Sequence, residues 1–169
     1  MAKFVLSGGF WQADAYLTPL SRTLRVYIMD ETGASPTERQ LRAYERFQTL
    51  PTTLCDEIAR HAIRYCDRID DLVGLEAEGI AINRSQIGQH FRITTLLIPR
   101  LADSGTDYYF ISADCDWEPE HGMQIILEND AIVYCSDHSS LAFGAAWQKV
   151  LDEPDETRAQ ILRDALQTL

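Results

Sequence analysis

The chain has 169 residues, of which 46% are hydrophobic and 24% are charged, and its formal net charge is −11. This size and composition are typical of one globular domain, so we expect residues 1–169 to form a single domain with an apolar core. The excess of carboxylates argues against nucleic acid or an anionic membrane as the partner, because both are bound by clusters of Lys and Arg.

The sequence shows no signal for export or membrane insertion. It has no apolar run of about 18 residues, and the short run after Lys3 is too brief for a signal peptide. Cys55 and Cys66 fall on one expected helix about 16 Å apart along its axis, and no C-x-x-C pair is present. These features favour a cytoplasmic protein with reduced cysteines.

The first half of the chain shows strand patterns followed by helix patterns. Aromatic and branched side chains predict strands at residues 10–17 and 23–30. Ser35-Pro36-Thr37-Glu38 has the form of a capping box with Pro at the first helical position, which predicts a helix to about Thr49. A second helix is expected after Pro51, because apolar residues recur there at helical steps: Leu54, Ile58, Ala62, Tyr65, Ile69 and Leu72.

The second half predicts mainly strands. One strand is expected at residues 90–98, and three more at residues 108–115, 123–128 and 131–136. Turns at Glu118–Gly122 and at Asn129-Asp130 would join the last three strands into an antiparallel meander. Helices are expected at residues 141–151 and 154–169. The predicted fold class is α+β, a mainly antiparallel sheet with a C-terminal three-stranded meander, packed with about four helices.

The turns also predict which side chains share a face of the meander. A two-residue loop at Asn129-Asp130 pairs Ile126 with Val133, and a close approach of Trp117 to Met123 pairs Cys115 with Ile125. In this register one face is apolar or aromatic throughout: Tyr109, Ile111, Ala113, Cys115, Trp117, Met123, Ile125, Leu127, Ile132 and Tyr134. The opposite face carries Phe110, Ser112, Asp114, Asp116, Gln124, Ile126, Glu128, Val133 and Cys135.

Carboxylates are concentrated from Leu101 to Gln148, a segment with nine Asp and Glu residues and no Lys or Arg. A charged rim around an apolar centre is typical of a protein-binding surface, and such a surface would suit a basic protein partner. The alternative is that a helix covers the apolar centre and the carboxylates merely surround it. The expected rim is Asp114, Asp116, Glu118, Glu120, Glu128 and Asp130, and the expected centre is Phe110, Ile126 and Val133.

The same segment holds candidate groups for catalysis. His121, His138 and nearby carboxylates would suit metal-assisted hydrolysis if separate turns brought them together. Glu118, Glu120 and His121 are candidates for acid–base chemistry, although side chains at a hairpin tip are usually solvated. No phosphate loop, dinucleotide motif or serine-hydrolase motif is present, so we predict no cofactor and no catalytic residue.

Residues 108–135 resemble an uncharacterised bacterial domain family. The resemblance is carried by the aromatic strand at Phe110, by the hairpin at Asn129-Asp130 and by a W-x-x-E-H-G motif that spans Trp117 to Gly122. Similar small acidic domains occur among immunity proteins of contact-dependent and secreted polymorphic toxins. The resemblance implies that Trp117, His121 and Gly122 form a structural corner, in which Trp117 fills the core and His121 bonds a carboxylate or a backbone group.

These patterns lead to three hypotheses. The first is a non-enzymatic bacterial binding protein of the immunity type, which neutralises a basic toxin domain through its acidic surface. The second is a metal-assisted hydrolase that uses His121, His138 and nearby carboxylates. The third is a homodimeric structural or regulatory module.

Overall fold

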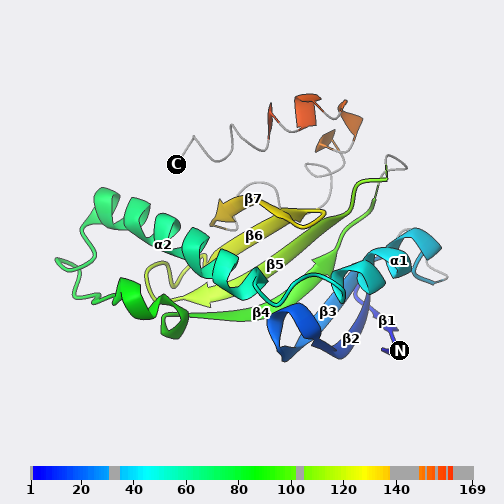
Figure 1. Ribbon diagram of the computed structural model, residues 1–169, viewed down its shortest axis with the longest axis horizontal. Coiled ribbons are helices and arrows are strands. Elements are labelled where there is room, and N and C mark those ends of the chain that lie inside the picture. Colours follow the sequence, from blue (N-terminus) through cyan, green and yellow to red (C-terminus); the bar gives the residue numbers. More distant parts are fainter. Residues whose placement is uncertain are drawn as a thin grey trace.

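A computed structural model of the chain describes residues 2–30, 35–101, 105–137, 149–150, 152–154, 156–158 and 160–161. Its strands form one seven-stranded sheet in chain order, with β3 and β4 parallel and the other neighbours antiparallel (Figure 1). The predicted α+β class with a C-terminal meander is confirmed. The strands are β1 (Val5–Ser7), β2 (Phe10–Leu17), β3 (Arg22–Met29), β4 (Phe91–Ile98), β5 (Tyr108–Cys115), β6 (Met123–Glu128) and β7 (Ala131–Ser136).

The main helices lie in the connection from β3 to β4. Because these two strands are parallel, the chain must cross over the sheet between them. The crossover contains α1 (Glu38–Phe47), α2 (Leu54–Val73) and the 3-10 helix η2 (Arg84–Gln89), while the short 3-10 helix η1 (Thr18–Leu20) joins β2 to β3. Both α-helices therefore cover the same face of the sheet, as Figure 1 shows. We call this side the helix face.

The predicted helical stripe of α2 is buried against the sheet for most of its length. Leu54, Ile58, Ala62 and Tyr65 are all buried. Leu72 is 69% exposed instead, because the last turns of α2 extend past the strands (Figure 1).

The start of α1 differs from the predicted capping box by two residues. The N-cap is Thr37, whose hydroxyl accepts a hydrogen bond from the backbone N–H of Gln40, and the Gln40 side chain bonds back to the N-cap backbone. Ser35 is not the cap. Gln can take the place of Glu in a capping box, so Thr37 and Gln40 provide the same reciprocal pair two residues later.

The predicted apolar face of the meander is the helix face. Nine of its ten expected members pack into the main core or against it: Tyr109, Ile111, Ala113, Cys115, Trp117, Met123, Ile125, Leu127 and Ile132. The pairing of β5 with β6 is shifted, since Ala113 lies opposite Met123 and Ile111 opposite Ile125. The predicted pairing of Cys115 with Ile125 was wrong, but the shift is an even number of residues, so every side chain keeps its face.

A bulge in β7 changes the faces of its last residues. Glu128 lies opposite Ala131 as predicted, but Ile126 lies opposite Tyr134 and not opposite Val133, because the register shifts between Ile126 and Leu127. A bulge inserts one extra residue and reverses the alternation after it. Tyr134 therefore leaves the helix face, and Cys135 joins the helix-face core. The prediction that Cys115 and Cys135 lie on opposite faces was wrong.

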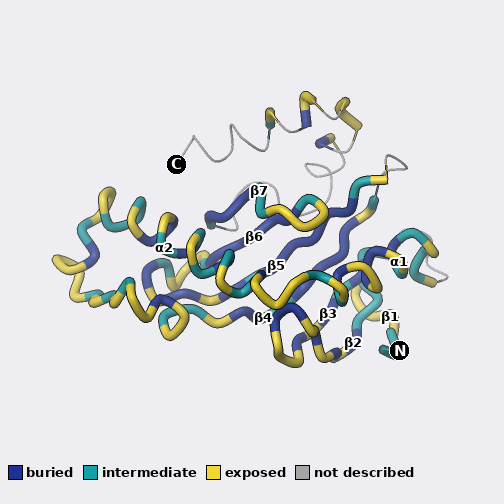
Figure 2. The backbone as a smooth tube through the Cα atoms, viewed as in Figure 1, coloured by how far each residue is buried: buried dark blue, intermediate teal, exposed yellow. Residues whose placement is uncertain are grey.

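The other side of the sheet, which we call the Phe110 face, carries a second apolar cluster. Its buried members are Leu97, Tyr108, Phe110, Ile126, Tyr134 and Val150, and Ile161 packs against them. The strands are dark along this part of the sheet in Figure 2. Val150 and Ile161 therefore pack on the centre of this face. Most of the helices expected at residues 141–151 and 154–169 lie outside the described residues.

Candidate functional site: an acidic groove at the end of β4 and β5

A polar groove of about 570 Å³ lies where β4 begins and β5 ends. We call it the β4–β5 groove. It brings together five residues that the sequence singled out, namely Asp114, Asp116, Glu120, His121 and Gly122. It is lined by Gln89, His90, Phe91, Arg92, Ala113, Asp114, Cys115, Asp116, Pro119, Glu120, His121 and Gly122.

His90 is held at both ring nitrogens. Its Nδ1 lies 3.0 Å from Oδ2 of Asp116, and its Nε2 lies 3.2 Å from the backbone nitrogen of Asn83, which can only donate. The proton of the neutral ring is therefore assigned to Nδ1. The Asp116 backbone N–H also donates to the carbonyl of His90 at 2.9 Å. His90 fixes the position of Asp116 and has no free nitrogen with which to accept a substrate proton.

Asp114 pairs with Arg92 across the β4–β5 ladder. The guanidinium Nη2 lies 2.6 Å from Oδ2 of Asp114, and the two side chains are 76% and 64% exposed. An ion pair this exposed contributes little to stability. Arg92 nevertheless neutralises one carboxylate of a segment that has no cation of its own.

Glu120 is the free carboxylate of the groove. It is exposed, and no hydrogen bond or ion pair joins its side chain to the rest of the described chain. With Asp114, Asp116 and Glu120 set against Arg92, the lining carries more negative than positive charge when its histidines are neutral. Such a lining favours a cationic group.

The turn at the rim of the groove is a rigid corner. Gly122 has φ +67°, a left-handed conformation that glycine adopts without steric cost, and its N–H donates to the Glu118 carbonyl at 2.8 Å. Nδ1 of His121 lies 3.1 Å from Oε1 of Glu118. This hydrogen bond raises the pKa of His121. The expected bond from His121 to a nearby carboxylate is present.

Trp117 anchors this corner in the core, as expected. Its side chain is 2% exposed and makes edge-on contacts with Tyr65 of α2 and with Phe91 of β4. Edge-on aromatic pairs add to the free energy gained by burial. The carboxylates of the groove are therefore presented by a fixed backbone.

The remaining predicted carboxylates lie at the opposite end of the meander. Glu128 pairs with Tyr108 at the start of β5, whereas Asp114 lies six residues further along the same strand. At the rise of a β-strand this is about 20 Å. Glu128 accepts a hydrogen bond from the Tyr108 hydroxyl at 2.9 Å, and Asp130 is exposed in the hairpin turn. The expected single acidic rim is thus two separate clusters.

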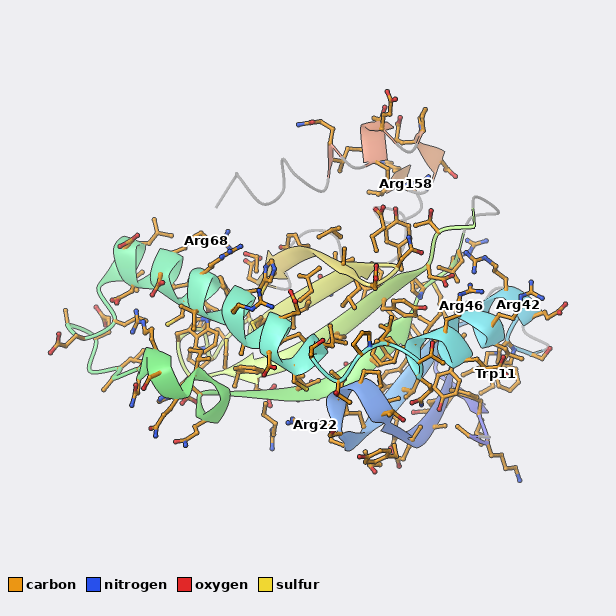
Figure 3. The ribbon with its side chains drawn as sticks, viewed as in Figure 1. Trp11, Arg22, Arg42, Arg46, Arg68 and Arg158 are labelled. Carbon is orange, nitrogen blue, oxygen red and sulfur yellow. The ribbon has the colours of Figure 1, made fainter. Side chains whose placement is uncertain are left out.

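A buried ion cluster that the sequence did not predict lies next to Glu128. The Asp107 carboxylate is 4% exposed and bonds the guanidinium groups of Arg39 and Arg46, which come from α1 (Figure 3 labels Arg46). The Tyr109 hydroxyl lies 3.3 Å from Oδ2 of the same carboxylate. Burial alone would raise the pKa of Asp107, but the hydrogen bonds from Arg46 and Arg39 hold it below its ordinary value. Asp107 links α1 to the sheet and is not available to a partner.

The expected apolar centre of the binding surface is covered. Phe110 is 1% and Ile126 0% exposed, and Val133 is half-buried against their cluster. The alternative was that a helix covers this centre, and the centre is indeed buried, with Val150 in its cluster and Ile161 packed against it. Phe110 and Ile126 cannot contact a partner while this cover is in place.

The other candidate chemistries find little support in the described residues. Among them, no group of three or more His, Cys, Asp and Glu residues is arranged to hold a metal ion, and His138 lies outside them. Burial raises the pKa of the Cys115 and Cys135 thiols to about 12, so these groups are not thiolates at neutral pH. None of the helices in the described part of the chain combines the length and apolar character that a membrane span requires.

A family model described as a domain of unknown function (DUF6985) matches residues 3–143. The chain belongs to this family. The matched range includes the whole β4–β5 groove and ends before Val150, which packs on the Phe110 face. No match was found among curated proteins or among solved structures.

Proposed function

We propose that this protein is a non-enzymatic bacterial binding protein of the immunity type, which neutralises a basic toxin domain in the cytoplasm. The β4–β5 groove would receive a Lys or Arg side chain of that partner. The observation that carries the proposal is the unpaired, exposed carboxylate of Glu120 beside Asp116 in a groove with an excess of negative charge.

The rigidity of the site supports binding. His90 holds Asp116 through the Asp116 side chain and the Asp116 backbone N–H, and the next residue, Trp117, is buried in the core. Carboxylates that are fixed before the partner arrives lose little conformational entropy on binding. The net charge of −11 adds long-range attraction for a basic domain and speeds its association.

The chemistry of the groove argues for binding over catalysis. Both ring nitrogens of His90 are engaged, and His121 is 57% exposed at a turn, where a general acid or base gains little from its surroundings. The metal-assisted hydrolase hypothesis depends on His138, which lies outside the described residues. The experiment below distinguishes this hypothesis from binding.

Co-expression with the product of the adjacent gene tests the proposal. We expect the two chains to co-purify, and we expect this protein to restore growth to cells that express the neighbour alone. The Glu120→Lys variant should weaken both effects, and Glu45→Lys, an exposed change of the same charge on α1, should keep them. The proposal is wrong if no complex forms, or if divalent metal binds stoichiometrically and confers hydrolytic activity. A stable homodimer in sizing experiments, without a complex, would favour the homodimeric module.

A further inference from the structure

We propose that the free edge of β2, between β1 and α1, is a docking site for an extended segment of a basic protein, which adds to the sheet as one more strand. A groove of about 540 Å³ lies along this edge, and we call it the β2-edge groove. It is lined by Ala2, Asp14, Ala15, Tyr16, Tyr44, Glu45 and Gln48. The proposal is independent of the β4–β5 groove and of its partner.

The first strand of the sheet, β1, covers only part of β2 (Figure 1). It pairs with Phe10, Trp11 and Gln12, whereas β3 pairs with every residue of β2. Residues 13–17 therefore have a neighbouring strand on one side only. An edge of this kind presents backbone N–H and C=O groups with which another chain can pair.

The backbone groups of alternate residues point toward this free edge. In a strand, the N–H and C=O of one residue point to one side, and those of the next residue point to the other. Gln48 of α1 marks the free side, because its side-chain amide accepts from the Thr18 N–H and donates to the Tyr16 carbonyl, both at 3.0 Å. The N–H and C=O of Asp14 and the N–H of Tyr16 therefore point the same way. Among the described residues none of these three groups has a partner on that side.

Gln48 shows that this edge accepts an amide from outside the sheet. Its side-chain amide bonds one carbonyl and one N–H of β2 and its extension, as a peptide group of an added strand would. The same amide nitrogen donates to the Tyr44 hydroxyl at 3.0 Å, which holds it in place. The backbone groups of Asp14 lie next along the edge, where an extended peptide would continue the pattern.

The residues before β1 leave this position open. The ring of Phe4 packs edge-on against Tyr44 of α1, with 5.5 Å between the ring centroids, and contacts the helix-face core. Residues 2–4 belong to no strand, and within the described chain no backbone hydrogen bond joins them to β2. The groove therefore lies between Ala2 and the edge of β2.

The side chains around the groove favour a basic residue in the occupant. In an added antiparallel strand, the residue opposite Ala15 would point to the helix face, where Tyr44 and Glu45 line the groove. Glu45 is exposed and makes no hydrogen bond or ion pair in the described chain, whereas Asp14 is paired with Arg25. No Lys or Arg is among the described residues of the lining. A Lys or Arg at this point would pair with Glu45 while its aliphatic stem packs on Tyr44.

Short peptides test the proposal on the full-length protein. The probe is Thr-Val-Lys-Val-Thr with both ends blocked. With its lysine opposite Ala15 in antiparallel register, its valines lie opposite Tyr16 and Asp14, and their N–H groups face β2. Backbone N-methylation of the second valine removes the donor opposite Asp14. N-methylation of the lysine, whose N–H points away from β2, is the matched control.

We expect the probe to shift the NMR amide signals of Asp14 and Tyr16 and to slow the exchange of these protons with solvent. N-methylation of the second valine should weaken binding about tenfold, and N-methylation of the lysine should change it little. Tyr16→Pro removes an N–H from the free edge without removing a bond to β3, so it should weaken binding more than Tyr16→Ala. The N-methylated probes decide the matter if Tyr16→Pro does not fold.

An exchange of charge tests the contact with Glu45. A probe with Glu in place of its lysine should bind the wild-type chain about threefold to tenfold more weakly. Glu45→Lys should weaken the binding of the basic probe and restore that of the acidic one. Glu120→Lys should leave both unchanged, because it alters only the β4–β5 groove. Failure of this proposal and failure of the proposed function are therefore distinguishable.

Four results would overturn the proposal. They are no binding, equal binding of the two N-methylated probes, amide shifts that lie away from β2, and affinity that does not depend on the sign of the probe's charge. A dimer that forms with rising concentration and protects the Asp14 and Tyr16 amides without the probe would also overturn it, since a second copy would then occupy the edge.

Discussion

Asp116 and His90 are joined by a hydrogen bond in the β4–β5 groove, with Oδ2 of the carboxylate 3.0 Å from Nδ1 of the ring. Because the backbone N–H of Asn83 occupies Nε2, we predict that the neutral imidazole is the Nδ1–H tautomer in solution. Long-range proton–nitrogen NMR correlations of His90 measure this directly. His61, on α2, provides the internal comparison. A predominant Nε2–H tautomer would mean that His90 is free to act as a base through Nδ1.

Replacing the buried carboxylate of Asp107 should strongly destabilise the fold. We predict that Asp107→Asn lowers the free energy of unfolding by about 2–3 kcal/mol, because Arg39 and Arg46 then lose their buried partner. This is less than for a fully buried pair, since the Arg46 side chain is 48% exposed and partly screened by water. Urea unfolding measures the change. Asp130→Asn, exposed in the nearby hairpin, is the control and should change stability by less than about 0.5 kcal/mol.

The contribution of Asp107 to the free energy of unfolding should depend on pH. Its pKa in the folded protein is lowered, so the stability it provides is fully present above the unfolded value of about 3.9 and is lost as pH falls through the folded value. We predict that the difference in unfolding free energy between wild type and Asp107→Asn is constant near neutral pH and shrinks below about pH 4. A difference that stays constant into acid would show that Asp107 does not carry its charge in the folded state.

The pKa of His121 should be higher than that of an ordinary histidine. The hydrogen bond that the His121 ring donates to the Glu118 carboxylate raises the pKa of His121, so protonation is favoured below the folded value and is lost as pH rises through it. We predict that the pKa of His121, measured by NMR, lies above about 6.5 and moves back toward that value in Glu118→Gln. As His121 loses its proton the groove becomes more negative, and a cationic partner should bind more tightly. An unchanged pKa in Glu118→Gln would contradict the assigned contact.

Much of the fold could be predicted from sequence because the signals are local. The alternating and aromatic residues of β5, β6 and β7, the left-handed Asn129 and the Gly122 turn gave the strand bounds as observed. The bulge in β7 could not be predicted, because no turn residue marks it. It places Tyr134 on one face and Cys135 on the other, opposite to a regular alternation.

Only part of the site could be predicted, because the net charge of a segment does not show which of its carboxylates pair with cations from distant parts of the chain. Asp114 and Asp107 looked uncompensated because their partners, Arg92 on β4 and Arg39 and Arg46 on α1, lie far away in the sequence. Pairing of β4 with β5 brings Arg92 to Asp114, and that pairing has no signal within residues 101–148. Within the groove Glu120 remains as the carboxylate without a partner among the described residues, and the expected acidic surface is divided between the two ends of the meander.

The rate of association with the neighbouring gene's product tests the central claim most directly, namely that the β4–β5 groove binds a basic partner. Stopped-flow measurements over a range of salt concentrations should show that Glu120→Lys slows association by about threefold to tenfold at low salt and flattens its salt dependence. Glu45→Lys, with the same change in net charge, should slow it much less. If the two variants have the same effect, or if neither changes the rate, the groove is not the binding site.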